Sequence, residues 1–454
     1  MNSDRIASQG FHCAEIVANV LAETLLRRRP ADRSLSSAFY EHHEFGSRDR
    51  RLISETLFSV LRWWGWLKHL APKAFREAVE HPEKKTELSF PLSAFYPLFS
   101  MAWYMEGKNE LPPAAAWWFE EAGFERDDIK FLPQDAAALD RKRYLKPFLD
   151  DGGKSLRQMD LLPEWCYARI NPPRPVEELL EWLQHRPPVW LRLYAEKPED
   201  VLAELRDNDF RASLHPVMQD AVCLEFAGGN LRALQSFRNG AFEIQDIASQ
   251  CVALICDPKP GQQWWDACAG GGGKTLHLAS LMQRKGIITA SDIRVHKLQD
   301  LKLRARRAQF PNIRCKEWLG KEVPRYNNLF HGVLVDTPCS CSGTWRRNPD
   351  GRWTTFDDDI QGFNDLQSQL LENASKAVMP GGTLVYSTCS MFSAENQAIV
   401  EDFLSRHPEY ELSPFICPLT GRQTDGTNQL WPWDADCDAM FTAKMVKKWL
   451  VVSG

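Results

Sequence analysis

The second half of the chain repeats one pattern, in which a short apolar strand ends in polar residues and a longer helical segment follows. The candidate strands are residues 263–267, 286–292, 331–336 and 382–388. This alternation predicts an α/β fold with a parallel sheet that helices cover on both faces. In such sheets the ligand binds beyond the carboxyl ends of the strands, so the residues that follow each strand are the candidates for function.

A glycine-rich turn follows the first strand and leads into a helix. Its residues are Cys268, Ala269, Gly270, Gly271, Gly272, Gly273 and Lys274. Glycines let the backbone approach a ligand closely, and the N–H groups at the helix start then face that ligand. A phosphate-binding P-loop is excluded, because Cys268 stands where its first glycine belongs. A dinucleotide fingerprint lacks its third glycine, so the related turn that binds S-adenosylmethionine is favoured, with an NAD enzyme as the alternative.

A carboxylate supports a cofactor that carries a ribose. The second strand ends in Asp292, roughly 20 residues after the glycines, where it can accept hydrogen bonds from both ribose hydroxyls. Lys274 stands at the start of the helix, and we expect it to contact the ligand or to order the turn.

Two further strand ends carry cysteines. Cys339 and Cys341 follow the third strand in the run DTPCSC that begins at Asp336, and Cys389 follows the fourth strand in the run STCS. A single buried cysteine is usually an inert apolar side chain. Cysteines at adjacent strand ends, beside the predicted cofactor turn, indicate chemistry instead.

Methylation of cytosine at carbon 5 uses such a pair of thiols. Carbon 5 is a poor nucleophile until a thiolate adds to carbon 6 and converts the ring into an enamine. A base must then remove the carbon 5 proton so that the thiol is eliminated. One cysteine would therefore attack and the other would assist release. Asp336 is placed to bond the cytosine edge and to support the charge that develops on the ring.

Two other uses of the cysteines are weaker. Cys339, Cys341 and Cys389 could ligate zinc, but no paired C-x-x-C motif or histidine completes a tetrahedral set, so we expect no metal. A redox dithiol would normally be C-x-x-C, which is absent here.

Taken in order, these segments resemble the Sun/RsmB-type RNA cytosine-C5 methyltransferases. The matching motifs are the DACA turn with GGKT, the strand-end acid, DTPCS followed by Arg346 and Arg347, and STCS followed by Glu395 and Asn396. The resemblance covers residues 240–445, roughly, and implies a Rossmann-like methyltransferase domain that uses S-adenosylmethionine.

The resemblance also implies a role for each residue of the site. Cys389 would be the nucleophile, and Cys339 would help to resolve the covalent intermediate. Residues 268–274 would wrap the methionine end of the cofactor, with Asp292 on the ribose and Asp336 near both cofactor and base. The sequence departs from the family in two places. Gly271 replaces a common proline, and the acid on the adenine side has only Glu317 as its nearest counterpart.

The pattern divides the chain into three predicted domains. Residues 1–150 are expected to be helical, with apolar residues at helical spacing over 13–26 and 53–64, and are loosely similar to the NusB-like RNA-binding domain of the bacterial ribosomal enzymes. Residues 160–240 form a small α+β module that is similar to the RRM-like lead-in of the family. Residues 241–454 are the Rossmann-like catalytic domain.

Composition limits where the protein works and what it binds. The chain opens without a signal peptide and has no apolar run long enough to cross a membrane, so we expect a cytoplasmic protein with reduced thiols. The net charge of −5 argues against a uniformly basic surface, but RNA needs only a local patch. We also expect a monomer.

Three basic segments are candidates for RNA contact, with a solvated surface as the plainer interpretation. The first contains Arg27, Arg28, Arg29, Arg33, Arg48, Arg50 and Arg51. The second contains Arg294, Lys297, Lys302, Arg304, Arg306, Arg307, Arg314, Lys316, Lys321 and Arg325. The third is the pair Arg346 and Arg347, which we expect to grip the backbone of an unstacked target.

The predicted function is methyl transfer from S-adenosylmethionine to cytosine in RNA. Small-subunit ribosomal RNA is the favoured substrate and transfer RNA the alternative. A non-catalytic RNA-binding or ribosome-assembly factor that retains the fold is the rival, and the pair of thiols argues against it because a binding module has no use for them.

Overall fold

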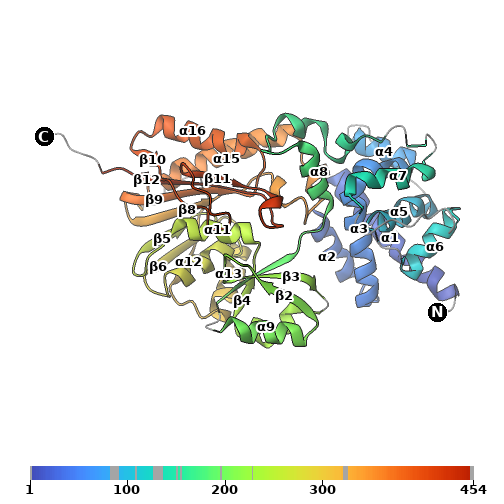
Figure 1. Cartoon of the computed structure of the whole chain (residues 1–454), viewed down its shortest axis with the longest axis horizontal. Coiled ribbons are helices and arrows are strands. Elements are labelled where there is room, and N and C mark those ends of the chain that lie inside the picture. The colour runs from blue at the N-terminus through green and yellow to red at the C-terminus, as the bar shows by residue number, and fades with distance from the viewer. Residues whose placement is uncertain are drawn as a thin grey trace. The chain divides into compact units, whose positions relative to one another are not determined.

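The computed structural model describes residues 3–81, 91–107, 110–125, 136–149, 152–153, 156–194, 197–227, 229–320 and 326–449. The chain forms two compact units, shown in Figure 1. Unit 1 is Met1–Arg186 together with Trp345–Phe356, and unit 2 is Pro187–Thr344 together with Asp357–Gly454. The segment that follows the first cysteine motif therefore belongs to the unit that contains the N-terminus.

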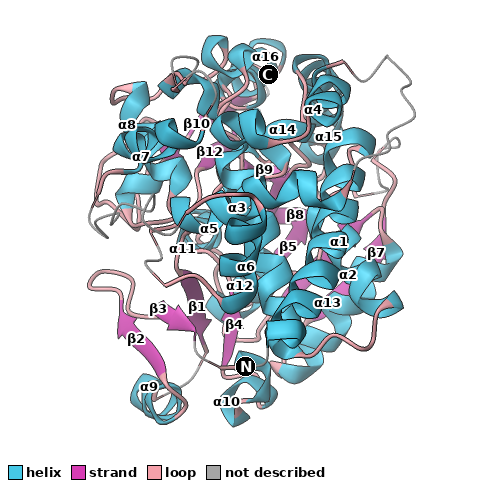
Figure 2. Cartoon of the chain, turned by 90° about the vertical axis from the view of Figure 1, so that its right-hand side faces the viewer, coloured by secondary structure: helices cyan, strands magenta, loops and turns pink. Residues whose placement is uncertain are grey.

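Unit 1 is helical, and Figure 2 shows it as helices joined by loops. Its helices are α1 (Ser3–Arg27), α2 (Ala31–Glu41), α3 (Ser47–Leu67), α4 (Lys73–Glu80), α5 (Tyr96–Met105), α6 (Pro113–Glu121), α7 (Lys142–Leu145), α8 (Val176–Gln184) and α14 (Gly351–Thr354). The apolar spacing predicted the two longest correctly, because residues such as Cys13, Val17 and Val20 line one buried face of α1.

The segment Trp345–Phe356 is built into the core of unit 1. Arg352 is fully buried and donates hydrogen bonds to the backbone carbonyls of Arg62 and Leu183. The backbone N–H of Ala31 in turn donates to the carboxylate of Asp350 at 3.0 Å. Because backbone groups and buried charges pair in this way, the segment is an integral part of the helical unit.

Unit 2 contains a small antiparallel sheet. Its strands are β1 (Val189–Leu193), β2 (Phe210–Leu214), β3 (Ala221–Ala227) and β4 (Phe242–Ile244), in the order β2-β3-β1-β4, with helices α9 (Pro198–Asp207) and α10 (Gln235–Arg238) between them. This β-α-β-β-α-β order is the ferredoxin-like arrangement. Strand β4 lies beyond residue 240, so the sheet extends a few residues past the predicted module.

The larger sheet of unit 2 confirms the predicted α/β fold. Its strands are β5 (Gln263–Asp266), β6 (Ile287–Asp292), β7 (Ile313–Glu317), β8 (Phe330–Asp336), β9 (Val378–Thr388), β10 (Tyr410–Leu412), β11 (Thr427–Leu430) and β12 (Met440–Lys447). The order is β10-β12-β9-β8-β5-β6-β7, and β11 pairs with β12. Strands β5 to β9 are mutually parallel, whereas β12 joins the edge antiparallel to β9.

Helices cover both faces of this sheet, and successive residues of each strand point to opposite faces. Trp264, Leu334 and Val385 pack in the core on one face with α11 (Ile247–Cys256), α12 (Gly273–Leu281) and α13 (Val295–Arg307). Trp265 and Tyr386, one residue further on, pack on the other face with α15 (Asp357–Ser375) and α16 (Gln397–Arg406). Figure 1 shows the two helix layers on opposite sides of the sheet.

Among the residues that the structure describes, no helix combines the length and the apolar character that crossing a membrane requires.

Candidate active site

The candidate site lies where the strand order of the large sheet reverses. The chain leaves β5 toward β6 and β7, then returns to the other side of β5 as β8 and β9. The carboxyl ends of β5 and β8 are therefore neighbours with diverging connections, which is the position where open α/β sheets bind ligands. The glycine turn follows β5, and the two cysteine turns follow β8 and β9.

The glycine turn has a backbone that only glycine adopts easily. Gly270 has φ of +52° and Gly272 has φ of +85°. A Cβ atom on Gly272 would stand 2.5 Å from Cγ of Leu301 in α13, so the turn and that helix pack too closely for a side chain. The turn thus leaves backbone N–H groups at the start of α12, where a ligand can approach them.

Asp292, at the end of β6, holds the turn. Its carboxylate accepts a hydrogen bond from the N–H of Gly270 at 2.9 Å and is paired with the guanidinium of Arg294. Although burial acts in the opposite direction, the hydrogen bonds from Arg294 hold the pKa of Asp292 below its ordinary value. Glu317 ends the neighbouring strand β7 in register with Asp292, and its side chain is exposed at the same edge.

Lys274 links the glycine turn to the first cysteine strand. Its Nζ donates to Oδ2 of Asp336 at 2.7 Å, and the hydroxyl of Ser387 donates to Oδ1 at 2.6 Å. Burial lowers the pKa of Lys274, but the carboxylate of Asp336 outweighs it and raises that pKa. Asp336, at the end of β8, thus joins the start of α12 to the carboxyl end of β9.

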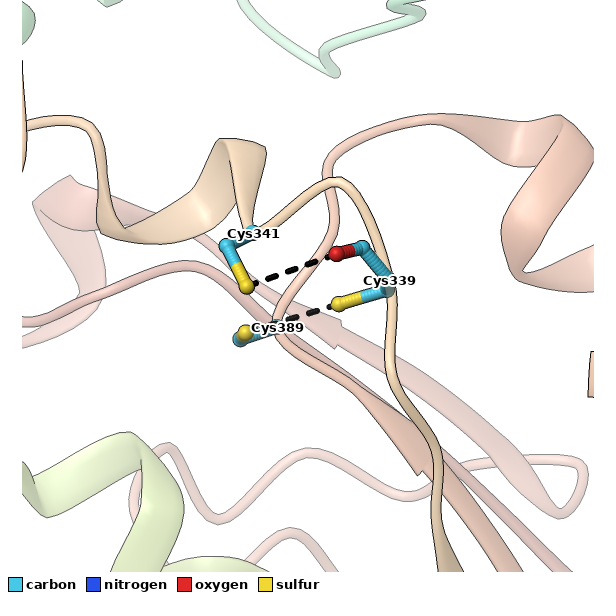
Figure 3. Close-up of side chains that lie close together, drawn as sticks. All are labelled: Cys339, Cys341 and Cys389. Atoms are coloured by element: carbon cyan, nitrogen blue, oxygen red, sulfur yellow. Dashed lines mark hydrogen bonds between the residues drawn. The ribbon is translucent and has the colours of Figure 1, made fainter. Parts of the chain in front are cut away.

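Figure 3 shows Cys339, Cys341 and Cys389 with their sulfur atoms turned toward one another. The Sγ atoms of Cys339 and Cys389 are 3.5 Å apart, and all three Sγ atoms lie within 4.8 Å of one another. Cys339 is buried, Cys389 is half-buried and Cys341 is exposed. The structure therefore brings together the two cysteines that the sequence analysis paired, and it adds a third.

The three thiols ionise as one set. The neighbouring thiols of Cys339 and Cys389 lower the pKa of Cys341 well below the ordinary value of a thiol, although burial acts in the opposite direction. Arg294 and Lys274 also lower this pKa through their charge. Hydrogen bonding within the cluster and burial raise the pKa values of Cys339 and Cys389 well above the ordinary value, so the charge is favoured at Cys341.

A buried carboxylate fixes the two cysteine turns against each other. Glu395 is fully buried and accepts hydrogen bonds from the N–H and hydroxyl of Ser340, and from the hydroxyl of Ser390 at 2.5 Å. Asn396 accepts from the hydroxyl of Thr388 at 2.5 Å and donates to the carbonyl of Ser390 at 3.0 Å. The Glu395-Asn396 motif thus holds the residues on both sides of Cys389.

Some residues at this site were not expected from the sequence. Asp266 ends β5 as a buried carboxylate that accepts from the hydroxyl of Thr275 at 2.6 Å. Arg192 of β1 is buried and donates to the carbonyl of Gly273 at 3.0 Å. The position of Asp266 just before the glycines could have revealed it, whereas nothing local distinguishes Arg192 from other arginines.

The expectation that Arg346 grips RNA is wrong. Its side chain is 1% exposed, its guanidinium lies over the ring of Trp182, and its Nε donates to the carbonyl of His185 at 3.2 Å. A cation enclosed in this way within unit 1 is not available to a phosphate. Arg347, by contrast, is half-buried.

The basic segment around α13 is also partly used within the protein. Arg304 and Arg307 both pair with the buried carboxylate of Glu243 in β4, and Arg304 donates to the carbonyl of Gly271 at 2.6 Å. Arg304 therefore supports the glycine turn, and both guanidinium groups are paired within the protein. Lys321 and Arg325 lie outside the described residues.

Comparison with known proteins places the chain in a family. A family model described as 16S rRNA methyltransferase RsmB/F matches residues 253–446. The ribosomal RNA small subunit methyltransferases B of Yersinia pestis bv. Antiqua (strain Angola) and Yersinia pseudotuberculosis serotype O:1b (strain IP 31758) are each 34% identical over 294 residues, which are 63% of this chain and 67% of theirs. The chain belongs to the RsmB/F family of methyltransferases. The resemblance inferred from the motifs is thereby confirmed.

Solved structures share the fold. The crystal structure called PH0851 superimposes with a TM-score of 0.71 at 23% identity, covering 96% of this chain and 99% of that one. A methyltransferase homolog protein from Pyrococcus horikoshii gives 0.51 at 24% identity, covering 72% and 100%. The Rossmann-like methyltransferase fold is thus confirmed.

The residues of this RsmB/F chain fit S-adenosylmethionine, the predicted cofactor. The turn contains two glycines of positive φ, a conformation that only glycine adopts easily, and α12 begins at its fourth glycine, Gly273. A strand-end carboxylate, Asp292, stands beside the turn. These are the groups that a cofactor with an amino-acid end and a ribose requires.

Proposed function

We propose that this chain methylates carbon 5 of a cytosine in small-subunit ribosomal RNA, with Cys389 as a covalent nucleophile. The observation that carries the proposal is the pair of sulfur atoms of Cys339 and Cys389, which are 3.5 Å apart at the carboxyl ends of adjacent strands. Family membership supports the substrate, since the relatives are named as methyltransferases of the small ribosomal subunit.

Residues of the glycine turn, 268–274, would hold the methionine end of S-adenosylmethionine, and Asp292 would hold its ribose. Glu317 is the candidate for the adenine side, because it ends the strand next to Asp292 at the same edge. When bound, the cofactor supplies an electrophilic methyl group on its sulfonium.

Cys389 and Cys339 would have different roles in the reaction of the cytosine. The Cys389 thiolate forms a bond to carbon 6, and the electron pair of the C5–C6 double bond moves to carbon 5. After carbon 5 is methylated, the Cys339 thiolate accepts its proton, the double bond re-forms, and the C6–S bond breaks to release Cys389. The half-buried position of Cys389 and the buried position of Cys339 support this order, because the nucleophile must meet the base.

Asp336 would bond the edge of the cytosine. Its carboxylate is held in place by Lys274 and Ser387, so its orientation is set before the base arrives. A group that is oriented in advance stabilises the charge that develops on the ring without reorganisation.

Unit 1 is proposed as an RNA-binding part of the enzyme, in keeping with the loose similarity to NusB-like domains. Arginines of its first basic segment, such as Arg33 and Arg48, are exposed on the helices. The small sheet of unit 2 would act differently, since Trp190 and Arg192 on one of its faces pack into the catalytic part of the same unit. That face is not open to RNA.

The test measures transfer of labelled methyl groups to small-subunit ribosomal RNA, with transfer RNA as the comparison substrate and bisulfite sequencing to locate the product. The Cys389→Ala variant should lose both turnover and the covalent protein–RNA adduct. The Cys339→Ala variant should accumulate the adduct, because release fails. The opposite behaviour of the two variants would exchange their roles, and a lack of methyl transfer to either RNA by the native enzyme would refute the proposal.

A further inference from the structure

Cys341 is a third thiol in a site whose chemistry needs two. Cys389 and Cys339 suffice for attack and release in the proposed function, yet the Sγ of Cys341 lies within 4.8 Å of both their sulfur atoms. The side chain of Cys341 points back over the turn, with its Sγ 3.4 Å from the carbonyl oxygen of Cys339. Figure 3 shows all three sulfur atoms facing one shared space.

The backbone at Cys341 has a strained conformation. Its φ is +54°, in the left-handed region where glycine is favoured and a side chain costs about 1 kcal/mol or more. A non-glycine residue that is held there commonly serves a function. The strain is supported by neighbouring hydrogen bonds, since the N–H of Gly343 donates to the carbonyl of Cys389 at 2.9 Å and the N–H of Thr344 donates to that of Cys341 at 2.9 Å.

We propose that Cys339, Cys341 and Cys389 form a binding site for a soft, thiophilic metal ion such as Zn²⁺, Cd²⁺ or Cu⁺, and that the bound ion inhibits the enzyme reversibly. Sulfur atoms on a zinc ion with bonds of about 2.3 Å stand roughly 3.8 Å apart, so the cluster needs only a small adjustment. Thiolates select soft ions over Mg²⁺ or Ca²⁺.

The surroundings suit such an ion. Cys341 is exposed, so the ion can enter from solvent and a water molecule can complete its coordination as the fourth ligand. Binding displaces the thiol protons to solvent and changes no oxidation state. The ion occupies the sulfur lone pairs of Cys389, which are then unavailable for bond formation to carbon 6. The inhibition therefore rests on the proposed function, whereas the binding does not.

Direct binding is measured first, on the full chain with a phosphine reductant. Cd²⁺ reports sulfur ligands through its ultraviolet charge-transfer absorption, and competition with a chromophoric chelator gives the affinity for Zn²⁺. We expect one ion per chain, with a charge-transfer absorption whose intensity corresponds to three thiolate ligands. The Cys341→Gly variant should bind on the order of 100-fold more weakly, because it loses one of three ligands. Glycine also suits the positive φ, so this variant should fold.

The matched control is Cys315→Ser. Cys315 lies in β7, outside the thiol cluster, so its replacement should change neither the affinity nor the absorption. Equal affinity of the native chain and Cys341→Gly for Zn²⁺, or an absorption of fewer than three thiolates per ion, would overturn the proposed site.

Inhibition is measured second, with each variant compared with its own metal-free rate of methyl transfer. Zn²⁺ should inhibit the native enzyme, and a chelator should restore its activity. The Cys341→Gly variant should need on the order of 100-fold more Zn²⁺ for the same fractional loss of methyl-transfer rate. Tight binding without inhibition would leave the metal site standing and refute the role of Cys389 as nucleophile. Equal sensitivity of both enzymes would refute the inhibitory role of the site.

Discussion

At the scale of single residues, Asp266 shows how burial sets the chemistry of a strand end. It is 1% exposed, and the hydroxyl of Thr275 donates to its Oδ2, but no described residue donates to its Oδ1. Burial raises the pKa of Asp266 to about 7, which the hydrogen bond from Thr275 only partly offsets. Asp266 therefore holds a proton in the folded protein at pH values where the unfolded chain has released it.

Stability should consequently fall as pH rises through this range. The folded state binds one more proton than the unfolded state between the ordinary pKa of 3.8 and about 7, so the contribution is present in acid and is lost as pH approaches 7. Relative to Asp266→Asn, the native chain should lose roughly 2–3 kcal/mol of unfolding free energy between pH 5 and pH 8. Denaturant unfolding of both proteins at pH 5 and pH 8 measures this loss. A difference in unfolding free energy between the two proteins that does not change with pH would contradict the prediction.

At the scale of elements, the glycine turn is set by the close approach of α12 and α13. Gly272 precedes α12 with φ of +85°, and a Cβ there would meet Leu301 of α13. Gly261, in the turn before β5, has a similar φ of +90°, but a Cβ there would have open space around it. The two positions share the backbone conformation and differ in packing.

Alanine at each position separates these effects. Gly261→Ala should cost only the strain of the backbone, about 1 kcal/mol. Gly272→Ala carries the same strain and must also displace Leu301, so it should lower the thermal midpoint further and weaken binding of S-adenosylmethionine at least tenfold, as measured by calorimetry. Equal effects of the two substitutions on cofactor affinity would show that the approach of α13 does not shape the site.

At the scale of the whole molecule, one sequence motif is divided between two units. Cys339 and Cys341 belong to unit 2, whereas Arg346 and Arg352 are buried in unit 1. Arginine was predicted to bind RNA here because its charge follows the cysteine turn directly. The structure instead uses Arg346 to close a helical core, where the ring of Trp182 and a backbone carbonyl satisfy it.

Arg346→Ala and Arg33→Ala should therefore behave in opposite ways. Arg346→Ala should reduce the stability of the chain by roughly 2–4 kcal/mol and leave the salt dependence of RNA binding unchanged. Arg33 is exposed on α2, so Arg33→Ala should leave stability unchanged and reduce the salt slope by about 1 if its guanidinium contacts a phosphate. Thermal unfolding measures the change in stability, and RNA titrations at several salt concentrations measure the salt slope. A lower salt slope for Arg346→Ala would show that Arg346 contacts RNA after all.

The sequence alone determined the alternation of strands and helices, the residues at the strand ends and the family. These features are local, because side-chain periodicity and glycine content act within a few neighbouring residues. The parallel sheet then brings Asp336, Cys339 and Cys389 to one edge whatever the rest of the chain does.

Only the tertiary structure decided which charges face inward and which thiols meet. Glu243 and Arg304 are 61 residues apart and pair because the small sheet packs against the glycine turn. Cys341 joins the other thiols through a left-handed turn that a cysteine rarely adopts. Contacts of this kind depend on long-range packing. Residue type and spacing do not reveal them, because an arginine or a cysteine in the same local sequence can belong to different tertiary environments.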